Sequence, residues 1–249
     1  MFKDLKGKKT LITGASSGIG ECTAELFSSQ GAVVGIHYHT GKTAAENIVR
    51  KIQKNGGDAF ALESDLLDFL SVKKLIPRFL DTAGGIDVLI NNAGGPLGHA
   101  SFLEMDAESW NAALMLNLTA PAFLARDSFS YMKEHGEGRI INISSIAAKY
   151  GGSESSVPYG AAKRGLEAVT KSLACMGAPH NILVNSIRPG VIATPAHKKI
   201  GRLSLDERVK KIPVQRAGTP LDIARMCVFL GSECGNYITG QIYEIAGGD

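Results

Sequence analysis

The chain carries a glycine-rich turn, TGASSGIG at residues 13–20, between a short apolar run and an amphipathic stretch. Residues 10–12 have the character of a buried strand, and residues 21–30 have helical periodicity. Glycines at such a junction let the main chain approach a pyrophosphate, and the free N–H groups of the helix start attract the anion. The order of strand, turn and helix therefore predicts a phosphate-binding site, although Gly and Ser also form plain loops.

Short apolar runs alternate with longer helical patterns along the 249 residues. Such alternation favours right-handed crossovers and a parallel sheet with helices on both faces. The runs are rich in Val, Ile and Leu, as expected of strands buried on both faces. We therefore predict one doubly wound α/β domain over residues 1–249, with a seven-stranded parallel sheet. The predicted strands are residues 9–13, 32–38, 59–62, 88–90, 139–143, 182–187 and 241–245.

The least regular part of the chain is residues 194–216, which contain two prolines and many charges. A long irregular segment of an α/β domain is often a lid over the site, and a solvated excursion is the alternative. The next helix start is predicted at Thr219, with Pro220 at the first helical position and Asp222 in the first turn.

The composition argues against several functional classes. The formal net charge is only +3 and is scattered, so no nucleic-acid partner is expected. No apolar run approaches the roughly 20 residues of a membrane helix, and no export signal follows Met1, so no membrane partner is expected. Cys22, Cys175, Cys227 and Cys234 form no metal-ligand or C-x-x-C pattern. We expect a soluble cytoplasmic protein with reduced thiols and no metal.

A second candidate site lies at Tyr159 and Lys163, which share one face of a predicted helix. An ammonium group near the phenol favours the phenolate, and this prepares Tyr159 for proton exchange near neutral pH. A single pair of this kind usually only decorates a helix surface. Here, however, Ser144 and Ser145 directly precede that helix, at the end of the strand over residues 139–143. Their alternative role is hydrogen bonding to the main chain.

Parallel strands bring their carboxyl ends to one edge of the sheet, where ligands bind. The glycine turn, residues 91–94 (Asn-Asn-Ala-Gly) and the two serines all follow strands at this edge, although residues 91–94 are also compatible with a simple turn. Asn117 lies within a helical pattern over residues 109–132, where Asn is unfavourable, so it has either a special role or a surface position. Pro121 should disturb the same helix.

In this order and at these intervals, the motifs resemble those of the short-chain dehydrogenase/reductase family over essentially the whole chain. The resemblance implies a Rossmann-type NAD(P)-binding domain that transfers a hydride between nicotinamide and a carbonyl or secondary alcohol. The overall similarity points towards the 3-oxoacyl-(acyl-carrier-protein) reductases. The matching pieces are residues 13–20, 65–66, 91–94, Asn117, Ser145, Tyr159 with Lys163, and residues 189–194, 238–241 and 247–248.

The resemblance also implies residue roles. Tyr159 would exchange the proton with the substrate oxygen, and Ser145 would hydrogen-bond that oxygen. Lys163 would lower the pKa of Tyr159 and hold the nicotinamide ribose, and Asn117 would anchor a proton-relay water. The implied cofactor-binding set is Gly14, Ser16, Ser17, Gly18, Ile19 and Gly20 in the pyrophosphate turn, Asp65 and Leu66 at the adenine, Asn91, Ala93 and Gly94 towards the adenosine ribose, and Pro189, Gly190, Ile192 and Thr194 towards the carboxamide, together with Tyr159 and Lys163. The interval between Ser145 and Tyr159 is one residue longer than is usual in the family, so the loop between them is expected to bulge.

The end of the second strand bears on the choice of cofactor. NAD-preferring relatives carry an acidic residue where this chain has Tyr38. His39, Thr40 and Lys42 offer donors for a 2′-phosphate instead, which favours NADP(H) without excluding NAD(H). Ser17 tempers this preference, because many NADP-dependent members have Arg or Lys there. His37 and His39 alternate along the strand, so a metal site from that pair is not expected.

The expected substrate is a small carbonyl or alcohol compound. The leading hypothesis for its class is a 3-oxoacyl thioester. Relatives that dock an acidic carrier protein use basic residues where this chain has Gly136, Glu137 and His180, so carrier docking should be weak. A sugar or polyol dehydrogenase, a general ketone reductase and, more remotely, a nucleotide-sensing protein without turnover stay open. The resemblance further implies a homotetramer, with the helix from Ser109 and the Tyr159 helix in one interface and the last helix and strand in another.

Overall fold

The computed structural model describes residues 2–97, 101–194 and 205–249. Its strands form one parallel sheet in the order β3-β2-β1-β4-β5-β6-β7. The predicted strands are confirmed, with ends that differ by one or two residues. They are β1 (Lys9–Ile12), β2 (Val33–Tyr38), β3 (Asp58–Glu63), β4 (Val88–Asn91), β5 (Gly138–Ile143), β6 (Ile182–Pro189) and β7 (Ile242–Ile245).

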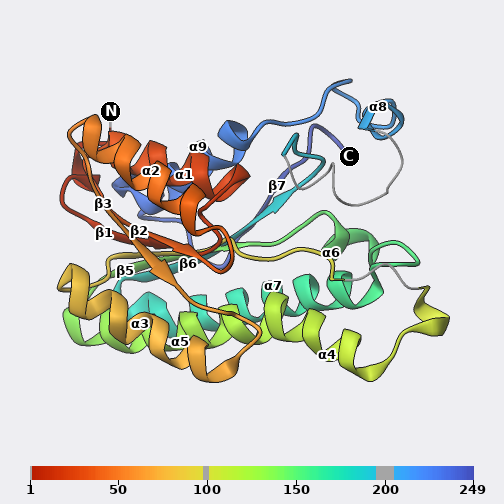
Figure 1. The fold of residues 1–249 in the computed structure, drawn as a ribbon, viewed down its shortest axis with the longest axis horizontal. Coiled ribbons are helices and arrows are strands. Elements are labelled where there is room, and N and C mark those ends of the chain that lie inside the picture. The colour runs from red at the N-terminus through yellow and green to blue at the C-terminus, as the bar shows by residue number, and fades with distance from the viewer. Residues whose placement is uncertain (1, 98–100, 195–204) are drawn as a thin grey trace.

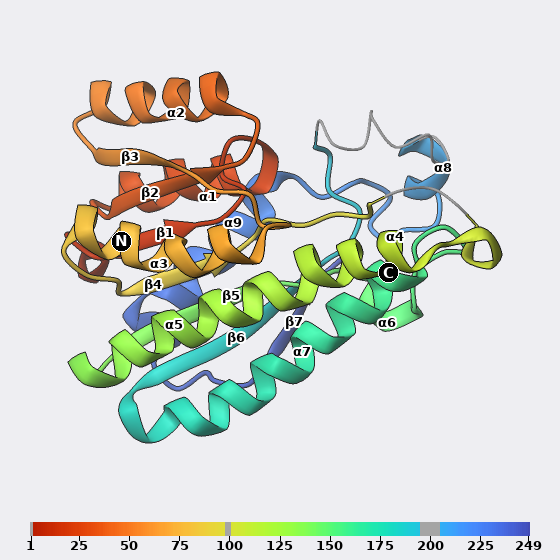
Figure 2. The same ribbon diagram turned by 60° about the horizontal axis from the view of Figure 1, so that its bottom comes forward.

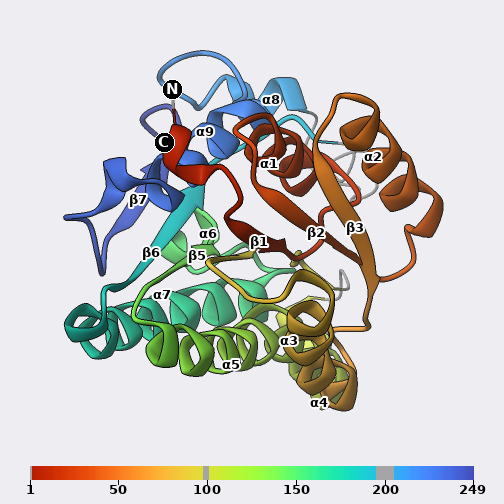
Figure 3. The same cartoon turned by 90° about the vertical axis from the view of Figure 1, so that its left-hand side faces the viewer.

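Helices cover both faces of the sheet, as predicted (Figure 1). On one face lie α1 (Gly18–Ser29), α2 (Lys42–Lys54) and α9 (Pro220–Gly231), and on the other lie α3 (Phe69–Ala83), α4 (Ala107–Leu114), α5 (Ala120–His135) and α7 (Val157–Gly177). Successive residues of a strand point to opposite faces of the sheet and pack in different hydrophobic cores. Ile12 and Ile90 pack with the α1 side, whereas Leu11 and Leu89 pack with the α3 side. The sheet is thus a layer between two hydrophobic cores (Figure 3).

The direction in which successive strands are added to the sheet reverses between β1 and β4. From β1 the chain steps outward to β2 and β3, and from β4 it steps the other way, to β7. In doubly wound sheets a ligand crevice opens at this switch point, beyond the carboxyl ends of the strands. The short helices α6 (Ala147–Tyr150) and α8 (Leu205–Val209) lie at the same end of the molecule as α4 (Figure 2).

The predicted continuous helix over residues 109–132 is interrupted. A π-helical turn, Met115–Thr119, separates α4 from α5. Within it, the fully buried Asn117 side chain donates to the carbonyls of Ala113 and Gly95, both at 3.0 Å. The surface alternative for Asn117 was therefore wrong. A π turn is common at functional sites, and here it also precedes Pro121, which cannot donate a main-chain hydrogen bond.

The predicted start of α9 is confirmed, with Thr219 and Asp222 forming a reciprocal capping box. The predicted lid falls partly on residues 195–204, outside the described residues, which resume at α8. Within the described ranges, no helix has both the length and the apolar character that a membrane crossing requires.

Candidate active site

A cavity of about 980 Å³ opens at the carboxyl ends of the strands. Its wall brings together the turn after β1, the segments after β2 to β6, and the start of α7. Most of the candidate residues line it: Gly14, Ser16, Ser17, Gly18, Ile19, His39, Thr40, Asp65, Leu66, Ala93, Gly94, Ser145, Tyr159, Lys163, Pro189, Gly190, Ile192 and Thr194.

Four candidates, Gly20, Lys42, Asn91 and Asn117, do not line this wall. For Lys42 and Asn91 a contact with the cofactor stays a prediction. Lys42 is the exposed first residue of α2. The buried Asn91 amide turns into the protein and donates to Pro121 O at 3.0 Å and to Asn142 Oδ1 at 2.9 Å. Asn92, which the sequence reasoning did not select, takes the wall position.

The turn after β1 depends on residues without side chains. Gly14 has φ +61°, and a Cβ on it would lie 2.9 Å from Ala93 Cα. A Cβ on Gly20 would lie 2.5 Å from Gly14 O, so Gly20 acts from behind the wall. The Asn92 amide fastens the turn by donating to Thr13 O at 2.8 Å and to Gly14 O at 3.1 Å. A bare main chain leading into the N-terminus of α1 fits a pyrophosphate.

The buried side chain of His37 also holds this turn. Gly14 N donates to His37 Nδ1 at 3.0 Å, and His37 Nε2 lies 3.0 Å from Ser64 O. Because an amide N–H can only donate, Nδ1 carries the lone pair and Nε2 carries the proton that goes to Ser64. Burial lowers the pKa of His37 to about 4, so the ring stays neutral at neutral pH. His37 thereby ties the glycine turn to the segment after β3.

We expect His37 to make the stability of the protein depend on pH. Its ordinary pKa is 6.5 and its folded pKa is about 4, so between these values the unfolded chain binds more protons. The free energy of unfolding should therefore fall as pH is lowered through this window, by up to about 3 kcal/mol from this group. Denaturant titrations at both ends of the window should show a shallower fall for His37→Asn. An unchanged fall in His37→Asn would contradict the assignment, and exposed His135→Asn is the matched control.

From the sequence alone, His37 was considered only as one member of a metal pair with His39. Within the described part of the chain, no group of His, Cys, Asp and Glu could hold a metal ion. The role of His37 as a clasp depends on partners that are distant in sequence, which a local pattern does not reveal.

Tyr159 and Lys163 lie on one face of α7, as predicted. The Lys163 ammonium is 5.9 Å from the Tyr159 ring centroid and donates to Ile143 O at 2.7 Å. Burial lowers the pKa of Lys163 to about 8, which leaves most of the group charged at neutral pH. A cation at this distance favours the phenolate form of Tyr159. Gly94 lies between Lys163 and Asn117, since a Cβ there would be 3.0 Å from Lys163 Nζ and 2.6 Å from Asn117 Oδ1.

The two serines after β5 face different partners. Ser144 is buried and donates to Glu167 Oε1 at 2.8 Å. Arg188 in turn holds Glu167 with two hydrogen bonds of 2.9 and 2.8 Å. Ser145 Oγ is half-buried on the wall and accepts from Ala147 N at 3.1 Å. Its proton therefore stays available for another acceptor, as the choice of Ser145 over Ser144 requires.

Between Ser145 and Tyr159 the chain forms α6 and then a turn in which Gly151 and Gly152 have φ of +83° and +88°. Tyr150, Gly152, Ser153 and Ser156 of this segment line the cavity. The interval between Ser145 and Tyr159, one residue longer than is usual in the family, had indicated that this part of the cavity wall would differ from that of relatives.

Comparison with known proteins identifies the family. The family model described as enoyl-(acyl carrier protein) reductase matches residues 14–248. The 3-oxoacyl-[acyl-carrier-protein] reductase FabG of Aquifex aeolicus is 36% identical over 244 residues, which are 98% of each chain. This chain belongs to the short-chain dehydrogenase/reductase family. It is accordingly a member of a family of oxidoreductases that act on CH–OH and carbonyl groups with a nucleotide cofactor.

Solved members of the family share the whole fold. A candidate NAD(P)-dependent gluconate 5-dehydrogenase from Beutenbergia cavernae, with bound NADP, superposes with a TM-score of 0.91 at 31% identity, covering 100% of this chain and 98% of that one. A 7α-hydroxysteroid dehydrogenase complexed with NADH and a 7-oxo bile acid has the same TM-score at 32% identity, covering 98% and 94%. Both nicotinamide cofactors thus occur among close structural neighbours.

Proposed function

We propose that this chain is an NADP(H)-dependent reductase of small carbonyl compounds, with 3-oxoacyl thioesters as the leading substrate class. The observation that carries the proposal is one cavity wall that holds the glycine turn together with Ser145, Tyr159 and Lys163. Similarity to 3-oxoacyl reductases over 98% of the chain supports the thioester class. Because Tyr159 and Lys163 are both present, catalysis is a better interpretation than nucleotide sensing.

A bound nicotinamide dinucleotide supplies hydride chemistry, while the protein supplies position and protons. In the proposed mechanism Tyr159 donates its hydroxyl proton to the substrate carbonyl oxygen, and Ser145 donates a hydrogen bond to the same oxygen as negative charge develops. The Lys163 cation stabilises the resulting phenolate. The side chain of Asn117 is used by Gly95 and Ala113, so a relay water would be held by its main chain.

The preference for NADP(H) is supported by the wall beyond β2. His39 and Thr40 are exposed on this wall, whereas the position that is acidic in NAD-preferring relatives is Tyr38. The carboxylate of Asp65 lies 3.7 Å from His39 Nε2. A protonated His39 ring partly balances the negative charge of Asp65. Donors without a competing carboxylate at the end of β2 suit a 2′-phosphate.

A carboxylate introduced at Thr40 tests this preference. We expect Thr40→Asp to weaken NADPH binding by about tenfold through repulsion of the 2′-phosphate, with a smaller change for NADH. Fluorescence titration of each reduced cofactor gives the two dissociation constants without turnover. Thr43→Asp, an exposed position of α2 outside the cavity, is the matched control. Equal weakening of both cofactors by Thr40→Asp would contradict the proposed 2′-phosphate contact.

The substrate class is tested by following NADPH consumption with acetoacetyl-CoA and, in parallel, with 5-ketogluconate. Fast turnover of the thioester alone supports the leading proposal. Turnover of the keto acid alone would move the assignment to sugar or polyol chemistry, for which the gluconate 5-dehydrogenase neighbour is the specific reason.

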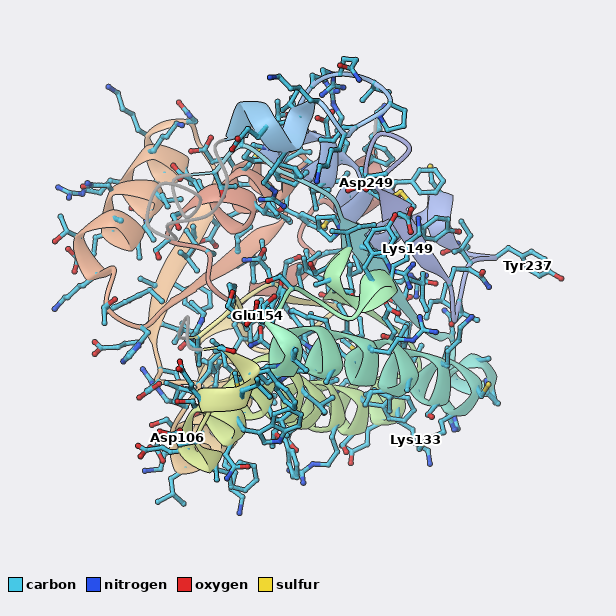
Figure 4. The ribbon with its side chains drawn as sticks, turned by 90° about the vertical axis from the view of Figure 1, so that its right-hand side faces the viewer. Asp106, Lys133, Lys149, Glu154, Tyr237 and Asp249 are labelled. Carbon is cyan, nitrogen blue, oxygen red and sulfur yellow. The ribbon has the colours of Figure 1, made fainter. Side chains whose placement is uncertain are left out.

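We also propose that the protein is a homotetramer. The face formed by α5 and α7 and the sheet edge at β7, which pairs with β6 alone, are the surfaces that the resemblance assigns to subunit contacts. The fully exposed Tyr237, which precedes β7, projects from the molecule beside that edge (Figure 4). Light scattering on the purified protein should give the mass of four chains, and a monomeric mass would contradict this proposal.

A further inference from the structure

The two ends of the cavity differ in charge. Among the described wall residues the only carboxylate is Asp65, which follows β3, whereas Ser145 and Tyr159 belong to the segments after β5. Strands β3 and β5 are four positions apart in the sheet, which corresponds to about 19 Å. The half of the cavity near Tyr159 therefore has no carboxylate among its described wall residues, and an anion there meets no acidic neighbour on the wall.

Two cationic side chains, Lys163 and Arg208, line the cavity. Lys163 is buried, and it donates to Ile143 O beside Tyr159. Arg208 reaches the wall from α8 and is half-buried. Helix α8 lies at the same end of the molecule as α6 and α4 (Figure 2). Arg208 thus reaches the cavity from another element than α7, which carries Tyr159 and Lys163.

The sequence around Arg208 is unusually basic. Residues 194–216 contain seven Lys or Arg and two Asp or Glu, a formal charge of +5 in a chain whose total is +3. The remainder of the chain is therefore slightly acidic, and positive charge is concentrated in the segment that includes α8. Of these cations Arg208 lines the cavity, and positive charge beside a cleft attracts anions and raises their rate of association.

We propose that Arg208 binds an anionic group of the substrate whose carbonyl lies at Tyr159, and so selects substrates with a distal phosphate or carboxylate. This inference rests on the proposed function and specifies its substrate class. A guanidinium group pairs with either oxyanion through two parallel hydrogen bonds. The oxyanion can come from the phosphates of a coenzyme A-type thioester or from the carboxylate of a keto sugar acid.

A pair of thioesters with the same reacting group tests the inference. Acetoacetyl-CoA carries phosphates, whereas the N-acetylcysteamine thioester of acetoacetate is neutral. Arg208→Gln should raise KM for acetoacetyl-CoA on the order of tenfold, with little change in kcat and none for the neutral thioester. Arg208→Lys should recover part of the loss. Lys211→Gln, which removes the same charge from a neighbouring exposed residue off the wall, should have a much smaller effect.

A binding measurement separates recognition from turnover. Calorimetric titration with free coenzyme A should give a dissociation constant about tenfold weaker for Arg208→Gln than for the wild-type protein. Equal changes for the charged and the neutral thioester, an unchanged KM and binding constant, or an equal effect of Lys211→Gln would each overturn the inference.

Failure of the proposed thioester activity can be distinguished from failure of the inference about Arg208. If neither thioester is reduced, the same variants are compared on 5-ketogluconate and the neutral keto sugar fructose, together with binding of gluconate. A loss confined to the carboxylates then supports Arg208 as the anion contact with a sugar acid as the source. Unchanged gluconate and coenzyme A binding in Arg208→Gln would overturn the inference whether or not turnover is found.

Discussion

Replacement of Tyr159 by Phe is expected to lower turnover by about 10²- to 10⁴-fold while cofactor binding is retained. The hydroxyl group is the proposed proton donor to the substrate oxygen, and Phe preserves the ring that lines the cavity. Lys163 keeps its hydrogen bond to Ile143 O in this variant, so the wall around the nicotinamide end should be unchanged. Steady-state kinetics with NADPH and fluorescence titration of NADPH, on the same preparation, give the two quantities.

Tyr150→Phe is the matched control, because Tyr150 also lines the cavity and loses the same hydroxyl group. Its turnover should stay close to that of the wild-type protein. If Tyr159→Phe retained wild-type turnover, or if both variants lost activity equally, Tyr159 would not be the proton donor.

Replacement of Glu167 by Ala is expected to destabilise the protein by about 3 kcal/mol or more. The Glu167 side chain is 2% exposed, and it accepts hydrogen bonds from Ser144 and Arg188. Its removal leaves the Arg188 guanidinium, itself 12% exposed, with Glu244 as its remaining ion-pair partner among the described residues. A largely buried guanidinium that has lost its bidentate partner opposes folding, and so does a Ser144 hydroxyl group left with only a long contact of 3.5 Å to Lys163 O.

Urea denaturation at neutral pH gives the free energy of unfolding for this variant and for Glu134→Ala, an exposed position of α5. The control should change little, because exposed charges contribute little to stability. A difference between wild type and Glu167→Ala below about 1 kcal/mol would show that the buried pair does not stabilise the fold. Because Ser144 adjoins Ser145, we also expect kcat of the variant to fall, even at temperatures where it is folded.

The features that were predictable from the sequence have local causes. The strands follow from short runs of Val, Ile and Leu, and the glycine turn follows from residues 13–20, where Gly14 adopts a left-handed conformation. The position of Tyr159 relative to Lys163 follows from helical geometry alone. Convergence of the motifs on one cavity follows from the parallel sheet, whose strands all end at the same edge.

The features that were not predictable depend on pairing between distant residues. His37 meets Gly14 and Ser64, and Glu167 meets Arg188, across intervals that no local pattern encodes. Which of Asn91 and Asn92 lines the cavity depends on the end of β4. There the Asn91 side chain faces the protein interior, and the Asn92 side chain faces the cavity. Lys42 is placed outside the cavity because α2 begins there.

The central claim is that a hydride passes between a nicotinamide cofactor and a substrate carbonyl in this cavity. We would measure it by reducing acetoacetyl-CoA with NADPH that carries deuterium at the transferable C4 position, and by locating the label with mass spectrometry. The proposed function predicts deuterium on the carbinol carbon of the 3-hydroxyacyl product, in amounts equal to the NADPH consumed, and loss of this product in Tyr159→Phe. Oxidation of NADPH without transfer of the label, or no product from any carbonyl compound tested, would contradict it.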